Sequence, residues 1–123
     1  MFEHVGLKVR DIDASVHFYL AALGPLGYEL TSQDETTVSF ADPQGASLWL
    51  SADARLGHSL VHLAFRAPDR SAVDAFHRQG LKARGRDNGA PGLRADYAPD
   101  YYAAFLLDPD GNNIEAVYLR PSA

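Results

Sequence analysis

The sequence has no cysteine, which excludes a disulfide framework and any chemistry that needs a thiolate. It also has no block of basic residues, and its formal net charge is −5. This balance argues against nucleic acid or an acidic membrane surface as the main partner. No apolar run approaches the roughly 18 residues of a membrane span, and the N-terminus shows no signal-peptide pattern. We therefore expect a cytoplasmic protein that binds neither nucleic acid nor membrane.

What the sequence does contain is enough apolar material for a hydrophobic core. The chain has 123 residues, of which 46% are hydrophobic. A chain of this size and composition suffices for one compact domain, which we predict to cover residues 1–123.

The most informative stretch is the Asp-Pro-Asp-Gly turn at residues 108–111. Proline restricts φ, aspartate bonds to its own backbone and glycine accepts a positive φ, so this motif predicts a tight turn. The apolar run Tyr101–Leu107 precedes it and the β-favouring run Ile114–Tyr118 follows, which predicts a hairpin. Glu115 is then expected on the inward face of an otherwise apolar strand. Such a carboxylate is costly unless it is paired or bound to a metal ion.

A weaker copy of this hairpin occurs earlier, at residues 41–50. Its Asp-Pro-Gln-Gly turn aligns with the later turn without gaps, and Trp49 takes the place of Glu115. The first strands also correspond, with His4 aligned to His62. These matches indicate a duplicated unit, with module one at about residues 1–57 and module two at about 58–123. The second copy is longer between its first-strand histidine and its turn than the first copy is. We place the extra residues in a loop at Asp87–Asp100.

Each module is predicted to contain the elements βαβββ, which makes the fold class α+β. Asp11 and Asp69 are candidate helix N-caps, and Gly24 and Gly80 are expected to end the helices. The strands of module one are expected at Glu3–Val9, Tyr28–Ser32, Thr36–Ala41 and Ala46–Ser51, and its helix at Ile12–Leu23. Module two is expected to begin with a strand at Ser59–Ala67, followed by a helix.

His4, His62 and Glu115 hold matching places in the repeat: two first-strand histidines and one last-strand carboxylate. Two neutral imidazoles and one carboxylate facing a common concave sheet would form a metal site with positions open to water and substrate oxygens. These ligand types suit Fe, Zn, Mn or Ni. The alternative is that the histidines are structural residues held by hydrogen bonds.

These stretches also resemble a known family, the vicinal oxygen chelate superfamily, which includes glyoxalase I, extradiol dioxygenases and the fosfomycin- and bleomycin-resistance proteins. The matching stretches are His4–Val9, Ser15–Tyr19, His62–Phe65 and Tyr102–Val117. The resemblance implies two βαβββ modules that form a curved, partly open mixed-sheet barrel around a cleft with a divalent metal ion. It also implies a homodimer.

By this resemblance, His4, His62 and Glu115 match the metal ligands of the family. The fourth ligand position, a Glu or Gln in glyoxalase I, falls on Trp49, so the set looks closer to that of three-ligand members. The first hypothesis is therefore a metal-dependent lyase, isomerase or dioxygenase that binds a small oxygenated metabolite through its oxygens. The alternative is a metal-free protein of the bleomycin-resistance type that binds a drug or another small molecule.

Five aromatic or basic residues are further candidates for the site. Trp49 either stacks on a planar substrate or packs in the core. Arg94 and Tyr97 are predicted to bind substrate, with Arg94 as a clamp for a carboxylate. Tyr101 is a candidate for substrate binding, and Tyr102, together with Glu115, for catalysis, because a tyrosine can donate to a developing oxyanion. The simpler interpretation of the tyrosine pair is an alternating strand, with one side chain inward and one outward.

Overall fold

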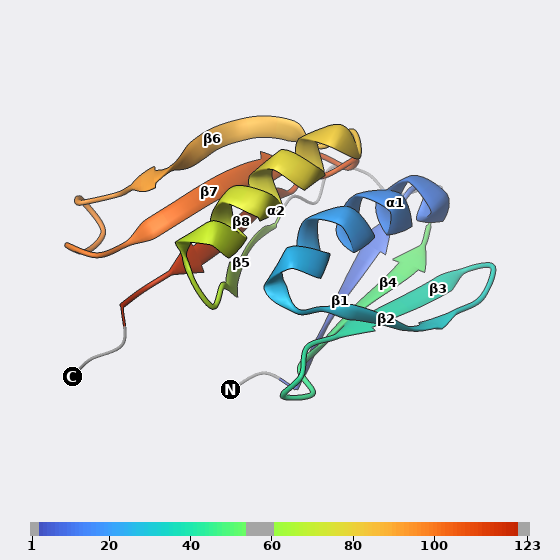
Figure 1. The fold of residues 1–123 in the computed structure, drawn as a ribbon. Coiled ribbons are helices and arrows are strands. Elements are labelled where there is room, and N and C mark those ends of the chain that lie inside the picture. The colour runs from blue at the N-terminus through green and yellow to red at the C-terminus, as the bar shows by residue number, and fades with distance from the viewer. Residues whose placement is uncertain (1–2, 54–60, 121–123) are drawn as a thin grey trace.

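The structure is a computed structural model that describes residues 3–53 and 61–120, and its elements follow the duplicated pattern (Figure 1). Module one contains β1 (His4–Val9), α1 (Ile12–Leu23), the 3-10 turn η1 (Gly24–Leu26), β2 (Glu29–Gln33), β3 (Thr37–Ala41) and β4 (Ser47–Ala52). Module two contains β5 (His62–Arg66), α2 (Arg70–Lys82), β6 (Arg86–Leu93), β7 (Tyr102–Leu107) and β8 (Asn113–Tyr118). The predicted α+β class with two βαβββ modules is confirmed. The expected module boundary at residues 57/58 and the first residues of the strand expected at Ser59–Ala67 lie outside the described residues.

Each module forms its own four-stranded mixed sheet, and the two sheets are not closed into one barrel. The strand orders are β1-β4-β3-β2 and β5-β8-β7-β6. In each sheet the first strand pairs in parallel with the last, and the other pairs are antiparallel. Figure 1 shows the two helices side by side, each covering one side of its own sheet. The opposite side of each sheet is called its helix-free face below.

Both helices begin where the sequence predicts, but the second ends later. The carboxylates of Asp11 and Asp69 each accept a backbone N–H three residues further on, which caps α1 and α2. The prediction that Gly80 ends α2 is wrong, because the helix continues to Lys82. Gly80 instead allows close packing, since a Cβ at this position would collide with the side chain of Leu106.

The long loop expected at Asp87–Asp100 is also partly wrong, because its first half is a strand. β6 pairs with β7, with register irregularities on both sides of Gly89. The connection that remains covers residues 94–101. The segment Asp87-Asn88-Gly89-Ala90-Pro91-Gly92 is poor in β-favouring side chains, so its strand depends on pairing with β7 rather than on local propensity.

The Asp-Pro-Asp-Gly turn connects the two modules as well as β7 and β8. Asp108 is 1% exposed and accepts a hydrogen bond of 2.6 Å from the hydroxyl of Tyr19 on α1. Asp110 accepts bonds of 3.2 Å from both the backbone and the guanidinium of Arg10, which follows β1. The two aspartates therefore fix the position of the end of β1 relative to the start of β8.

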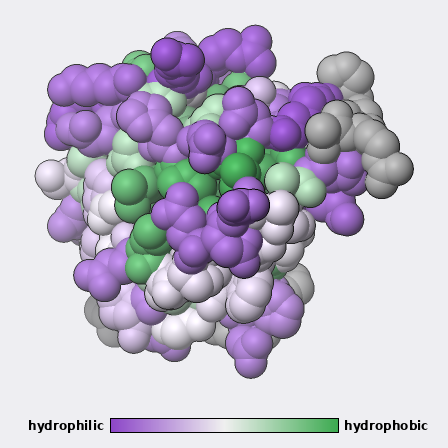
Figure 2. Space-filling view, turned by 90° about the vertical axis from the view of Figure 1, so that its right-hand side faces the viewer, coloured by the Kyte–Doolittle hydropathy of each residue, from purple (hydrophilic) through white to green (hydrophobic). Residues whose placement is uncertain are grey.

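Within residues 3–53 and 61–120, no helix is both long and apolar enough to span a bilayer. Viewed from the end of module one, hydrophobic residues form a band flanked by hydrophilic ones (Figure 2). Leu20 of α1 and Leu30 of β2 are exposed apolar residues of this module, at 48% and 39%.

Candidate functional site

Polar side chains gather on the helix-free face of the second sheet. On β8, Ile114 and Ala116 belong to the hydrophobic core, so the intervening Glu115 points to the helix-free face, as the alternation predicts. Glu115 is nevertheless only 3% exposed, because neighbouring side chains cover it. A buried carboxylate of this kind needs hydrogen-bonding partners.

Two neighbours supply these partners. The Nε2 atom of His62 on β5 lies 2.9 Å from Oε1 of Glu115, and the hydroxyl of Tyr101 donates to Oε2. Burial and, to a lesser degree, the hydrogen bond to Glu115 raise the pKa of Tyr101 to about 12. Tyr101 is therefore a neutral donor at physiological pH. His62, Glu115 and Tyr101 are called the His–Glu–Tyr cluster below.

Glu115 leaves one nitrogen of His62 available. An ionised carboxylate can only accept hydrogen bonds, so the Nε2 proton of His62 faces Glu115. The Nδ1 atom then has no partner among the described residues, and the side chain is 49% exposed. The imidazole also stacks on Phe105, with ring centroids 6.3 Å apart and an interplanar angle of 24°. A carboxylate-oriented imidazole with one accessible nitrogen is suited to general acid–base chemistry.

A pocket of about 380 Å³ opens beside the His–Glu–Tyr cluster. Its lining residues are Asn88, Gly89, Arg94, Tyr97, Phe105 and Asn113. Phe105 joins the pocket to the cluster, because its ring contacts His62 and also lies 5.4 Å from the guanidinium carbon of Arg94. Tyr97 packs edge to face on Tyr101, with ring centroids 5.0 Å apart. The structure thus places Arg94, Tyr97, Tyr101 and Glu115 on one face.

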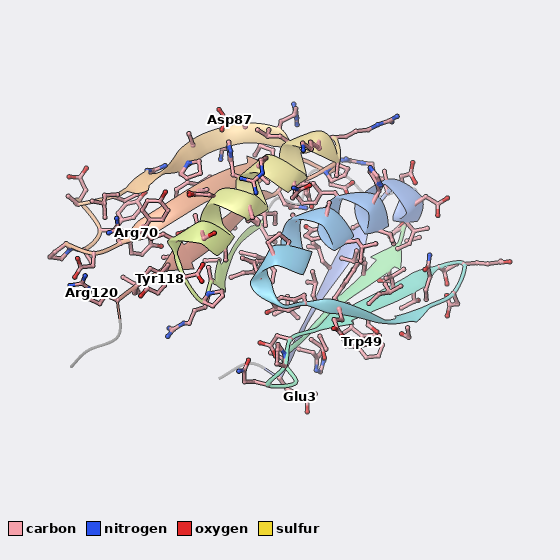
Figure 3. All side chains as sticks on the ribbon, in the orientation of Figure 1. Glu3, Trp49, Arg70, Asp87, Tyr118 and Arg120 are labelled. Atoms are coloured by element: carbon pink, nitrogen blue, oxygen red, sulfur yellow. The ribbon has the colours of Figure 1, made fainter. Side chains whose placement is uncertain are left out.

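Three other predicted site residues lie elsewhere. His4 and Trp49 share the helix-free face of the first sheet, with ring centroids 6.4 Å apart. Trp49 is 46% exposed and projects away from the helices (Figure 3), so it is not a core residue. Tyr102 points toward α2, where its hydroxyl donates to Asp74 at 2.6 Å. Tyr101 and Tyr102 therefore lie on opposite faces of the sheet, and only Tyr101 reaches Glu115.

The three predicted metal ligands do not form one group within the chain. His62 and Glu115 are adjacent, but Nδ1 of His4 lies 2.9 Å from the carboxylate of Glu3. No set of three or more His, Cys, Asp or Glu side chains in the described part of the chain is arranged to hold a metal ion. Both oxygens of Glu115 are also already hydrogen-bonded. As arranged within the described residues, His4 does not join His62 and Glu115, so the three-ligand site stays a prediction.

His4 and His62 do line a common cleft, at the seam between the two sheets. This cleft has a volume of about 330 Å³, and β1, β4 and β5 contribute to its walls. Tyr28 and Phe65 meet edge to face at its boundary, with ring centroids 5.5 Å apart. The expected cleft between modules is therefore present, although the His–Glu–Tyr cluster lies on only one side of it.

Sequence reasoning missed Asn88, Phe105 and Asn113. The position of Phe105 could have been predicted from strand alternation. It is paired directly with Glu115 across the hairpin, so the two side chains must share a face of the sheet. Asn88 lies in the segment predicted as a loop, and Asn113 lies between the predicted turn and the strand after it. Their contact, a 3.1 Å bond from Nδ2 of Asn88 to Oδ1 of Asn113, follows only from the sheet that brings β6 near β8.

Comparisons with known proteins agree on the family. The model of the Glyoxalase/Bleomycin resistance protein/Dioxygenase superfamily matches residues 1–116. A solved glyoxalase/bleomycin resistance protein from Albidiferax ferrireducens is 32% identical, with a TM-score of 0.81 over 98% of this chain and 99% of that chain. A comparison with curated proteins found no match.

Two more distant structures share the fold. A glyoxalase/dioxygenase from Nostoc punctiforme is 22% identical, with a TM-score of 0.75 over 98% of this chain and 92% of that one. A glyoxalase/bleomycin resistance protein/dioxygenase family enzyme from Burkholderia phytofirmans is 20% identical, with a TM-score of 0.73 over 96% of this chain and 98% of that one. The chain belongs to the glyoxalase/bleomycin resistance protein/dioxygenase superfamily, that is, the vicinal oxygen chelate superfamily.

Proposed function

We propose that this protein binds a small oxygenated molecule on the helix-free face of the second sheet and acts on it by proton transfer, as an isomerase or lyase. The observation that carries the proposal is the His–Glu–Tyr cluster beside a pocket. His62 presents one nitrogen to solvent while Glu115 holds the other. Such a pair is the usual arrangement for a histidine that works as a general base.

In the proposed reaction, Nδ1 of His62 takes a proton from a carbon next to a carbonyl group and returns it to the same or a neighbouring atom. Glu115 orients the imidazole and stabilises the imidazolium that forms, because it is a buried carboxylate at 2.9 Å from Nε2. Tyr101 keeps the carboxylate in place by donating to its second oxygen. Its raised pKa ensures that this proton is retained during the reaction.

Deuterium exchange at carbon tests this proposal without knowledge of the natural substrate. The protein is incubated in D2O with a panel of small 2-hydroxy ketones and 2-oxo acids, and deuterium incorporation is followed by proton NMR. His62→Gln is expected to lower any exchange rate about 100-fold or more, as is typical for loss of a general base. His17→Gln, an exposed histidine on α1, is the matched control and should leave the rate unchanged. Equal rates in wild type and His62→Gln, or no exchange with any panel member, would refute proton transfer by His62.

A divalent metal ion is the second candidate component of the site. Two observations favour it: His62 and Glu115 are adjacent donors of the right chemistry, and His4 lines the same cleft as His62. A bound cation would act as a Lewis acid toward substrate oxygens. A three-ligand set requires either that His4 leave Glu3 and move toward His62 or that a second subunit supply a donor.

Elemental analysis of protein purified without a histidine tag distinguishes these alternatives. A metal-dependent enzyme should contain close to one Fe, Zn, Mn or Ni per site, and His4→Ala and Glu115→Ala should both remove it. If no metal is bound and small molecules bind without turnover, the protein is instead a metal-free binding protein of the bleomycin-resistance type.

We also propose that the chain forms a homodimer. The family resemblance and the exposed apolar side chains of Leu20 and Leu30 on module one support this assignment. Light scattering on the wild type should give twice the chain mass of 13.4 kDa. A dimer built through these side chains should dissociate in Leu20→Glu.

A further inference from the structure

We propose that the pocket beside the His–Glu–Tyr cluster is an anion subsite, and that Arg94 binds the carboxylate of a small planar acid there. This inference rests on the proposed function, because it names the substrate class of the same face. It is carried by the position of Arg94, by its lack of an acidic partner among the described residues and by the composition of the pocket walls.

Arg94 is a partly buried cation without a matching anion in the part of the chain that the structure describes. No carboxylate in residues 3–53 or 61–120 forms an ion pair with it. Its guanidinium makes one hydrogen bond among the described residues, from Nη2 to the backbone carbonyl of Ala90, at 2.7 Å. A guanidinium has five N–H donors, so most of them remain for a ligand. An unpaired guanidinium is an effective carboxylate site because its donors match both oxygens at once.

The neighbouring backbone holds this guanidinium in place before any ligand binds. Two glycines of β6 leave room for the side chain: a Cβ at Gly92 would lie 3.0 Å from Nη1, and one at Gly89 would lie 3.3 Å from Nη2. The bond to Ala90 and the ring of Phe105 fix its orientation further. A group that is already ordered loses less entropy on binding, which favours ligand affinity.

The rest of the pocket indicates the shape of the acid. Phe105 provides an aromatic wall, and Tyr97 is a second aromatic residue, 63% exposed. Oδ1 of Asn113 accepts a hydrogen bond from Asn88. Nδ2 of Asn113 is then a further donor that has no partner among the described residues. Aromatic walls with a few polar groups favour a flat ligand such as an aromatic or enolisable acid. Phe105 contacts both Arg94 and His62, so its ring borders both the anion subsite and the His–Glu–Tyr cluster.

Matched pairs of probes that differ only in charge test the subsite. The probes are benzoate with benzamide, and salicylate with salicylamide, titrated into ¹⁵N-labelled protein by NMR. In the wild type, each carboxylate should bind about 30-fold more tightly than its amide, because it alone pairs with the guanidinium. Arg94→Met should abolish this preference while leaving amide binding unchanged. Arg94→Lys should retain part of it, and Arg86→Met, at an exposed arginine that begins β6, should retain all of it.

The variant His62→Gln separates this inference from the proposed function. It should keep the carboxylate preference within about 2-fold, even though it loses proton transfer. If carbon exchange is absent but the preference depends on Arg94, the subsite stands and the catalytic proposal fails. Retention of the preference in Arg94→Met, or no binding of either carboxylate up to about 10 mM, would overturn the subsite.

Discussion

The contact between Tyr101 and Glu115 can be tested through stability, because it has a predictable size and pH dependence. Tyr101→Phe removes only the hydroxyl that donates to Oε2 of the buried Glu115. A hydrogen bond to a charged group contributes about 1.5–3 kcal/mol. The rise of the Tyr101 pKa from 10.0 to about 12 corresponds to roughly 2.7 kcal/mol before screening, which is an upper bound for the hydrogen bond because burial is the larger cause of the rise. Because Tyr101 is partly exposed, solvent screening lowers this upper bound, and we expect about 1.5 kcal/mol at pH 7.

The pH dependence follows from the direction of the pKa shift. The folded-state pKa of Tyr101 lies above the unfolded value, so the folded protein holds this proton more tightly. The stabilisation is therefore complete below pH 10 and is lost progressively as the pH rises from 10 toward 12. The difference in unfolding free energy between wild type and Tyr101→Phe should shrink over this range.

Urea unfolding at a series of pH values measures this difference in unfolding free energy. The contributions of the other tyrosines to the pH dependence cancel, because both proteins contain them. Tyr97→Phe is the matched control, since this phenol is 63% exposed and should change stability by less than about 0.5 kcal/mol. The reasoning is wrong if the two substitutions have equal effects at pH 7. It is also wrong if the effect of Tyr101→Phe is the same at pH 7 and pH 11.

Four further substitutions test other parts of the structure. Glu115→Gln should lower any carbon exchange about 100-fold by removing the charge that stabilises the imidazolium, which the D2O assay measures directly. Gly80→Ala should lower the free energy of unfolding by about 1–3 kcal/mol through overpacking, whereas Gly6→Ala, with nothing near its Cβ, should cost under about 1 kcal/mol in the same urea assay. Asp108→Asn should cost about 2–4 kcal/mol, because the buried carboxylate accepts four hydrogen bonds. Asp110→Asn should cost less at pH 7 than at pH 3, because burial raises the pKa of Asp110 and makes its charged form less favourable in the folded state.

Local signals were enough to predict most of the secondary structure. The capping aspartates and the apolar spacing predicted α1 at its observed bounds, and the Asp-Pro-Asp-Gly turn predicted the β7–β8 hairpin. Two predictions failed where tertiary contacts outweigh local preference. Gly80 lies within α2 because the space beside Leu106 requires glycine, and β6 forms because β7 pairs with it.

The duplicated pattern placed His4, His62 and Glu115 at equivalent positions in two modules, and strand alternation placed Glu115 opposite the core. These are local properties, and the amino-acid sequence alone determines them. The sequence does not determine whether equivalent positions meet, because that depends on how the two sheets are set against each other. Tertiary structure alone brings His62 and Tyr101 to Glu115, keeps His4 with Glu3, and lays Arg94 along β6 beside Phe105. Such contacts join side chains far apart in the chain, and only the packing of separate strands decides them.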